Sequence, residues 1–236
     1  MEQTRAWLKQ ARSVAVLTGA GISAESGVPT FRGKQGLWKQ YRPEELANAD
    51  AFHRDPRLVW EWYNWRRSLI AKAHPNPGHY ALADLASRIP NFTLISQNVD
   101  DLHEQAGSRD VLKVHGDIWQ LRCLNCGRQH IDPRPALPEI PPHCHCGGLL
   151  RPGVVWFGEE LPRHIWCKAL QAARTAELFL VIGTSAVVYP AASLVHIAKR
   201  AGAHIVELNI TETVITNDID DFLAGPCGEI LPKLIA

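Results

Sequence analysis

The side chains best suited to acid–base chemistry in this 236-residue chain follow two apolar runs. Residues Gln97–Asp100 follow the run 92–96, and His115 follows the run 111–114. The carboxyl ends of neighbouring parallel strands meet at the crevice where such sheets bind ligands. Because the pKa of an imidazole lies near neutral pH, His115 is suited to act there as a general base. We expect the two segments to share one cleft, and we interpret the nearby His103 as structural.

A glycine-rich segment, Gly19–Gly33, directly follows the apolar run 14–18. Glycines let the backbone approach phosphate groups, and the N-terminus of a following helix offers unpaired N–H groups. The third glycine of a dinucleotide fingerprint is replaced by Ala24, and no clear acidic residue closes a second strand about 20 residues later. The segment therefore predicts pyrophosphate binding and disfavours an ordinary dehydrogenase.

Three later segments are rich in small, hydroxyl-bearing or amide residues. They are Ile182–Ser185, Glu207–Thr211 and Gly225–Gly228. The first two lie at the ends of strand-like runs, where they are suited to contact phosphate or ribose groups. The third is a late loop that we expect to close on an adenine ring.

Four of the six cysteines form two close pairs within 24 residues of one another. They are Cys123, Cys126, Cys144 and Cys146. This clustering predicts one structural Zn²⁺ held by four thiolates, with no open coordination position. The second pair departs from the usual Cys-x-x-Cys spacing, so His143 competes with Cys144 for the third ligand position. We interpret the isolated Cys167 and Cys227 as core or pocket-wall residues.

The remaining pattern predicts an α/β fold. Strand-like apolar runs alternate with helix-like segments, which indicates a doubly wound parallel sheet with helices on both faces. The runs are apolar without alternation, as a sheet buried on both faces requires. The expected strands are 14–18, 92–96, 111–114, 178–182 and 204–208, and the expected helices include 76–88 and 191–201. Residues 34–75 and 117–157 do not fit this pattern, and we expect them to form a second, smaller domain with a helical and a zinc-binding module.

Composition limits the function classes. The chain is 46% hydrophobic and 21% charged, as a globular domain requires, and its formal net charge of +1 gives no indication of nucleic-acid or membrane binding. The N-terminal residues lack the order of a signal peptide. We expect a cytoplasmic monomer.

Taken together, the motifs resemble those of the sirtuins, the NAD-dependent protein lysine deacylases. The matching segments occur in family order over nearly the whole chain: Gly19–Arg32, Gln97–Asp100, His115–Gly116, the two cysteine pairs, Val155–Glu159, Gly183–Ser185 and Glu207–Asn209. The resemblance implies a Rossmann-like NAD-binding domain over 1–33, 76–116 and 158–236. It places 34–75 and 117–157 in the small domain.

The resemblance also implies roles for individual residues. His115 becomes the general base on the ribose hydroxyls, Phe31 shields the reacting ribose and Arg32 lies near the phosphates. The implied NAD-binding residues are Gly19, Ala20, Gly21, Ile22, Ser23, Glu25, Thr30, Phe31, Arg32, Trp38, Gln97, Asn98, Val99, Asp100, Gly183, Thr184, Ser185, Asn209, Ile210, Thr211 and Cys227. Val155, Trp156, Phe157 and Gly158 form a strand-like edge for the acyl-lysine peptide. The products are nicotinamide, O-acyl-ADP-ribose and free lysine.

The aromatic stretch Trp60–Arg67 bears on the acyl group. If it is helical, Tyr63 and Arg66 share a face, and a guanidinium beside a phenol can bind a carboxylate. Arg67 is the alternative partner of that carboxylate. From composition alone, an aromatic core helix with exposed arginines is the better interpretation. The Tyr-x-x-Arg spacing and the Gly225–Gly228 loop, however, resemble the sirtuin branch that removes succinyl, malonyl or glutaryl groups, and we expect deacetylation as well.

Two other functions compete with this interpretation. A protein ADP-ribosyltransferase would use the same NAD pocket but would add ADP-ribose to its target. A non-catalytic, NAD-sensing adaptor would have no use for the set Asn98, Asp100 and His115, so the sequence disfavours it.

Overall fold

The structure is a computed structural model that describes residues 1–30 and 46–236. Phe31, Arg32 and Trp38, which the sequence places at the NAD site, lie outside the described residues. Within the described ranges, none of the helices combines the length and the apolar character needed to cross a membrane.

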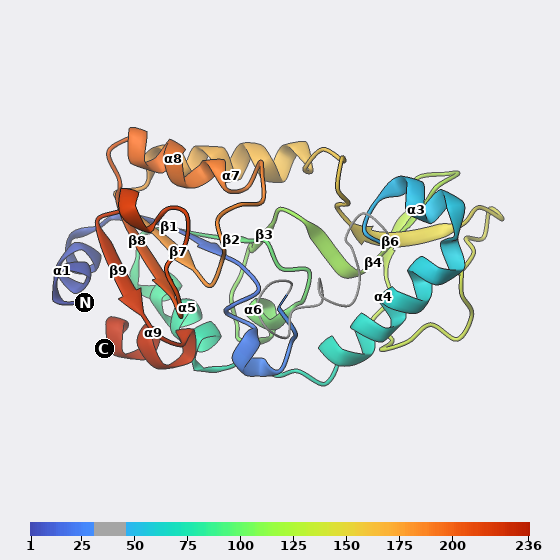
Figure 1. Cartoon of the computed structure of the whole chain (residues 1–236), viewed down its shortest axis with the longest axis horizontal. Helices are drawn as coiled ribbons and strands as arrows, with labels where there is room; N and C mark the ends of the chain where they lie inside the picture. Colours follow the sequence, from blue (N-terminus) through green and yellow to red (C-terminus); the bar gives the residue numbers. More distant parts are fainter. Residues whose placement is uncertain (31–45) are drawn as a thin grey trace.

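A six-stranded sheet forms the larger part of the molecule (Figure 1), and all its strand pairs are parallel. In spatial order the strands are β3 (Leu112–Lys113), β2 (Asn91–Ser96), β1 (Ser13–Thr18), β7 (Leu178–Ile182), β8 (His204–Asn209) and β9 (Asp221–Ala224). The five expected strands are confirmed to within about two residues at each end. The edge strand β9 is short and begins with an aspartate, so its sequence carries no clear strand signal.

Helices cover both faces of this sheet, as the doubly wound fold class predicts. Residues Ala15 and Leu17 of β1 pack with α7 (Arg163–Thr175) and α8 (Ser193–Arg200) on one face. Val14 and Val16 point to the opposite face, so the strand is apolar on both sides. The helices of that face are α1 (Glu2–Gln10), α5 (Pro77–Arg88) and α9 (Cys227–Ile235).

The strand order reverses at β1, which lies between β2 and β7. The chain leaves the ends of β1 and β7 through two tightly packed turns. A Cβ atom on Gly19 would lie 2.6 Å from the Cβ of Thr184, and Gly183 adopts a φ of +58°. Only glycine allows this approach, which opens a crevice at the position where such sheets bind ligands.

The segment after β1 differs from the expected α-helix. It forms turns and one short 3₁₀ helix, η1 (Ala24–Ser26), which ends at Gly27 with a φ of +83°. The Asn76 amide holds this turn by donating to the Ile22 carbonyl oxygen at 2.7 Å and to the Ser26 hydroxyl at 3.0 Å. A left-handed glycine ends helical structure, so the helix expected immediately after the glycines is wrong for residues 19–30.

A smaller module lies at one end of the molecule (Figure 1). Its antiparallel sheet has the order β5 (Gln129–Ile131), β4 (Gly116–Cys123) and β6 (Leu150–Val154). The helices α3 (Ala49–Arg54) and α4 (Pro56–Ile70) pack on it. Asp55 starts α4, because its carboxylate accepts the Leu58 N–H at 2.9 Å and Pro56 follows it. The exact domain boundaries stay a prediction.

Short elements complete the chain. They are α6 (Leu102–Gln105) and the 3₁₀ helix η3 (Thr216–Asp218). His103 lies on α6, where its side chain is buried.

Candidate active site

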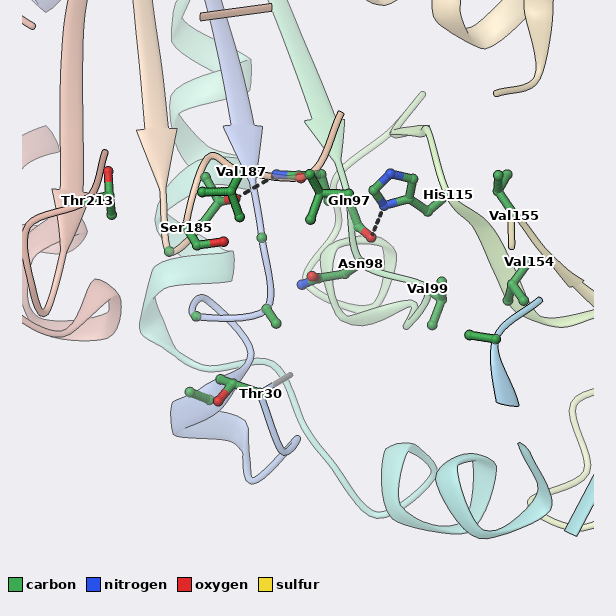
Figure 2. A pocket seen from close by; sticks show the side chains of 18 of the residues that line it. Thr30, Gln97, Asn98, Val99, His115, Val154, Val155, Ser185, Val187 and Thr213 are labelled. Carbon is green, nitrogen blue, oxygen red and sulfur yellow. Dashed lines mark hydrogen bonds between the residues drawn. The ribbon is translucent and has the colours of Figure 1, made fainter. Parts of the chain in front are cut away.

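A cleft of about 710 Å³ runs from the ends of the parallel strands to helix α4. Figure 2 shows Ser185, Val187 and Thr213 on one side of it, and Val99, Val154 and Val155 beside His115 on the other. Asn98 lies between these two groups. The cleft therefore joins the crevice of the large sheet to the small module.

His115 is held in one tautomer. Its Nδ1 atom lies 3.0 Å from the carbonyl oxygen of Gln97, and a carbonyl oxygen can only accept, so the proton is on Nδ1. The Nε2 atom then carries a lone pair. Burial lowers the pKa of His115 below its usual value, although its bond to Gln97 opposes this shift. The imidazole is thus neutral at neutral pH, as a general base requires.

Asn98 is positioned by groups behind the cleft. Its amide nitrogen donates to the Ser23 hydroxyl at 3.1 Å, and that hydroxyl donates to the Asp100 carboxylate at 3.1 Å. Burial raises the pKa of Asp100 to about 6, although hydrogen bonds from the Leu102 N–H and from Ser23 oppose it. Because Ser23 and Asp100 are buried and do not line the cleft, they act by orienting the Asn98 amide.

Two buried histidines extend this network, and the sequence analysis missed the first of them. His79 Nδ1 accepts the Asn76 N–H at 3.2 Å, and its Nε2 lies 3.5 Å from the Ser23 hydroxyl. His103 Nε2 lies 3.0 Å from the Thr18 hydroxyl. Burial lowers the pKa to about 4 for His79 and to about 3 for His103. Asn76 before a proline indicates a helix cap, and that signal gave no reason to connect His79 with the site.

The strand ends at the other side of the cleft are tied together by side-chain amides. Gln97 Nε2 donates to the Thr184 hydroxyl at 2.9 Å, and Asn209 Nδ2 donates to the Thr184 carbonyl oxygen at 3.0 Å. Glu25 accepts the N–H of Gly228 at 2.8 Å and so connects the glycine-rich segment to the start of α9. These bonds fix the crevice from β1 to α9.

Helix α4 closes the opposite end of the cleft. Tyr63 and Arg66 share a helical face, line the cleft and are both buried. Burial raises the pKa of Tyr63, so the phenol stays protonated. Burial lowers the pKa of Arg66, but a guanidinium stays charged at any working pH. The Arg66 guanidinium carbon lies 4.9 Å from the ring centroid of Trp62.

Arg67 points away from the cleft. Its guanidinium donates to the carbonyl oxygens of Ile118 at 2.7 Å, Asp132 at 2.5 Å and Arg134 at 2.7 Å. The side chain is fully buried. Of the two arginines that the sequence left open, Arg66 is therefore the one that faces the cleft, and Arg67 joins α4 to β4 and the loop after β5.

The four paired cysteines form a metal-binding cluster. Their sulfur atoms all lie within 4.8 Å of one another, with Cys123 and Cys146 3.5 Å apart and Cys126 and Cys144 3.8 Å apart. Tetrahedral Zn²⁺ with Zn–S bonds of about 2.3 Å places its sulfurs about 3.8 Å apart. The donor set therefore fits a structural zinc, and the cluster contains Cys144 and not His143.

The expected strand-like edge at Val155–Gly158 lies just beyond the end of β6. The Val155 N–H donates to the His115 carbonyl oxygen at 2.9 Å, and the Phe157 N–H donates to the Ala47 carbonyl oxygen at 2.9 Å. A single parallel bridge joins Phe157 to Asn48. The segment is extended but irregular, and it forms one wall of the cleft.

Comparison with known proteins identifies the family. The model of the Sir2 family matches residues 19–190. The chain belongs to the Sir2 family. It is 57% identical over 209 residues to an NAD-dependent protein deacylase of Aquifex aeolicus, covering 88% of this chain and 87% of that protein. It is 54% identical over 229 residues to NAD-dependent protein deacylase 2 of Pyrobaculum aerophilum, covering 97% and 92%.

The fold agrees with solved structures of Sir2 proteins. A Sir2 homologue in complex with NAD superimposes with a TM-score of 0.93 at 48% identity, covering 100% of this chain and 92% of that chain. The resemblance to the sirtuins is thus confirmed, and so is the sirtuin fold class.

The structure brings most of the sirtuin site residues inferred from the sequence to one cleft. The lining includes Gly19, Ala20, Gly21, Glu25, Thr30, Tyr63, Arg66, Gln97, Asn98, Val99, His115, Val155, Trp156, Phe157, Gly158, Gly183, Thr184, Ser185, Asn209, Ile210, Thr211 and Cys227. Ile22, Ser23 and Asp100 are buried and lie outside this lining.

Other residues, which the sequence did not indicate as site residues, also line the sirtuin cleft. They include Ala47, Trp62, Val154, Glu159, Leu161, Val187, Val188, Tyr189, Pro190 and Thr213. Residues 187–190 continue the chain beyond the end of β7, so their position along the strand end was an available signal. Trp62 and Val154 carry no such signal, because an apolar side chain in a helix or strand is usually a core residue.

Proposed function

We propose that this chain is an NAD-dependent protein lysine deacylase that removes carboxylate-bearing acyl groups, such as succinyl and malonyl, as well as acetyl. The observation that carries the proposal is one cleft lined by both His115 and the buried pair Tyr63 and Arg66. We name the part of the cleft formed by Gly19, Gly183 and Asn209 the nucleotide end. The part formed by Tyr63, Arg66 and Trp156 is the acyl end.

The residues of the nucleotide end fit NAD. Glycines permit close approach of the backbone at the point where the strand order reverses, and amides and hydroxyls at the ends of β2, β7 and β8 face the crevice. When bound, NAD would supply the electrophilic ribose carbon and the nicotinamide leaving group. Asn98, oriented by Ser23, would donate its amide on that side, and His115 Nε2 would accept a proton from a ribose hydroxyl.

The acyl end supports selection of a terminal carboxylate. The Arg66 guanidinium offers a fixed positive charge in a buried, largely aromatic setting, where it is worth more than in water. The protonated Tyr63 phenol offers a neutral donor one helical turn away. Val99, Val154 and Trp156 line the same cleft and help to exclude water from the reacting groups.

The test is a mass-resolved assay with NAD and two peptides of identical sequence, one carrying succinyl-lysine and the other acetyl-lysine. Loss of both acyl groups, with O-succinyl-ADP-ribose formed from the first peptide, supports the whole proposal. Acetyl loss alone would overturn the carboxylate-bearing specificity while keeping the deacylase. A peptide that gains ADP-ribose would identify a transferase instead, and no reaction with NAD still bound would point to an adaptor.

A further inference from the structure

The hydroxyl of Tyr63 has a partner that comes from the opposite wall of the cleft. The indole nitrogen of Trp156 lies 2.9 Å from the Tyr63 hydroxyl oxygen, across 93 residues of sequence. An indole N–H can only donate, so the phenol oxygen is the acceptor in this bond. Within residues 1–30 and 46–236, no group accepts the phenolic proton, although Tyr63 is almost completely buried. The proton is therefore available to a ligand in the cleft.

Trp156 is itself clamped on two sides. The Arg151 guanidinium carbon lies 3.4 Å from the centroid of the indole ring, and the ring of Phe52 lies 5.3 Å from it. The backbone N–H of Trp156 donates to Glu159 Oε2 at 2.9 Å. Arg151 donates to the same carboxylate oxygen at 3.0 Å and to the Val154 carbonyl oxygen at 2.8 Å. Both the ring and the backbone of Trp156 are thus held by the Arg151–Glu159 pair.

The charges of this clamp agree with its geometry. Although partial burial alone would raise the pKa of Glu159, hydrogen bonds from Arg151 and from the Trp156 N–H keep it below the usual value. Glu159 is therefore ionised at neutral pH. Arg151 is buried but Glu159 is 25% exposed, so this ion pair is weak evidence for stability, and its contacts with Trp156 favour a positioning role.

We propose that Trp156 is a positioning residue for acyl-group selection. Its indole N–H occupies a lone pair of the Tyr63 oxygen, so that the phenolic proton is directed to the terminal carboxylate of the acyl group. The Arg151–Glu159 pair keeps the indole in place for this task. This inference rests on the proposed function, because it assigns a cause to the selectivity that the proposed function requires.

The experiment compares the ratio of kcat/KM for succinyl and acetyl peptides across five variants. Trp156→Phe keeps the aromatic ring and removes the N–H, and we expect this ratio to fall about 3- to 10-fold, through a higher KM for the succinyl peptide. Tyr63→Phe should lower the ratio further. In the Tyr63→Phe background, Trp156→Phe should have no additional effect, because the hydroxyl it orients is gone.

Trp60→Phe is the matched control. Trp60 belongs to the same apolar core and donates its indole N–H to the Leu150 carbonyl oxygen at 2.9 Å, but it does not line the cleft. Its loss should lower thermal stability and leave the selectivity ratio unchanged. A fall of the ratio in Trp60→Phe equal to that in Trp156→Phe would overturn the positioning role.

The outcomes separate this inference from the proposed function. If Tyr63→Phe lowers the ratio and Trp156→Phe does not, the role of Trp156 is wrong and the proposed function stands. If neither Tyr63→Phe nor Arg66→Met changes the ratio, the carboxylate specificity itself fails. Should Trp156→Phe not fold, the indole N–H resonances in ¹⁵N-edited NMR spectra give a second test. Tyr63→Phe must then shift the resonance assigned to the Trp156 indole, because Trp62 also packs against the Tyr63 ring, and an unchanged Trp156 resonance would contradict the hydrogen bond in solution.

Discussion

The two ends of the cleft are built in different ways. At the nucleotide end, the ends of parallel strands supply the side chains, and hydrogen bonds between neighbouring strand ends fix them, as between Gln97 and Thr184. At the acyl end, one face of α4 meets the segment after β6, and the decisive contact joins Tyr63 to Trp156. The first construction depends on sheet register and the second on the packing of a small module. A substitution at one end of the cleft should therefore impair that end and leave the other end largely intact.

Metal removal should produce the largest effect, and it should affect the acyl end. Cys123 packs in the same core as Trp60 and Tyr63, so loss of zinc loosens the support of α4. We expect Cys126→Ser, or treatment with a strong chelator, to lower the Tm by about 10 °C or more and to abolish deacylation. NAD binding by the large sheet should survive in part, which calorimetric titration can measure.

Cys167→Ser provides the control for the metal experiment. Cys167 is exposed on α7 and lies outside the metal-binding cluster, so its loss should change neither the zinc content nor the Tm. If the protein keeps both its activity and the Tm of the zinc-loaded form after chelation, the structural role of the cysteines is contradicted.

Loss of His115, the proposed general base, should reduce turnover of both acyl groups equally. We expect His115→Ala to lower kcat about 10²- to 10⁴-fold for succinyl and acetyl peptides, since proton transfer from the ribose hydroxyl is a step common to both acyl groups. NAD affinity should change little. His164→Ala, at an exposed position on α7, is the matched histidine control. Unequal losses for the two peptides would mean that His115 also contacts the acyl group.

The pH profile tests the environment of His115. A general base works in its neutral form, and burial lowers the pKa of His115. Activity should therefore persist below pH 6.5, and kcat/KM should fall only as the pH drops through the lowered pKa. The measurement is kcat/KM against pH with the acetyl peptide, and an acidic limb centred at or above 6.5 would refute the assignment.

The adjacent arginines of α4 give a sharper test of the acyl end. Arg66→Met removes the charge that faces the cleft, and a hydrogen bond to a charged group is worth about 1.5–3 kcal/mol. We expect kcat/KM for the succinyl peptide to fall about 10- to 150-fold relative to the acetyl peptide. Arg67→Met removes four bonds to three carbonyl oxygens and should lower the Tm without changing this ratio. Equal effects of the two variants on the ratio would count against the carboxylate site.

The same contrast explains what could be predicted from the sequence. The strands, their parallel arrangement and the polar residues at their ends were predictable, because Gln97, His115 and Gly183 each directly follow an apolar run. The metal-binding cluster was equally predictable, since two closely spaced cysteine pairs are typical of a structural zinc site. At the acyl end, the helical spacing of Tyr63 and Arg66 indicated a shared face, but it could not separate Arg66 from Arg67. That choice depends on the carbonyl groups of residues 118–134, which pack against α4 only in the folded chain.

Some features of the site lie beyond any local pattern. The bond between Tyr63 and Trp156 spans 93 residues, and the contact between His79 and Ser23 spans 56. A tryptophan at position 156 or a histidine at position 79 does not by itself indicate a hydrogen-bond partner, because both residue types also occur in ordinary cores. The turn at Gly27 could not be predicted from the motif either, since a glycine-rich segment after a strand is compatible with both an α-helix and a 3₁₀ turn.

A separate expected effect concerns the pH dependence of folding, which should originate at the nucleotide end. His79 and His103 have pKa values lowered by burial to about 4 and about 3, so below pH 6.5 the unfolded chain binds protons that the native chain does not. Their contribution is absent above pH 6.5 and destabilises the fold as the pH falls. Asp100 acts in the opposite direction, because its pKa is raised to about 6 and the native state takes up its proton first.

The two histidines outweigh the single carboxyl, and the free energy of unfolding should fall on the order of 2–4 kcal/mol between pH 6.5 and 4. Thermal or urea unfolding at a series of pH values measures this slope. His103→Asn should flatten it, since the variant has no imidazole to protonate at that position. Tyr63 and Arg66 contribute nothing in this window, because the phenol stays neutral and the guanidinium stays charged. A slope unchanged in His103→Asn would mean that protonation of His103 does not contribute to the pH dependence.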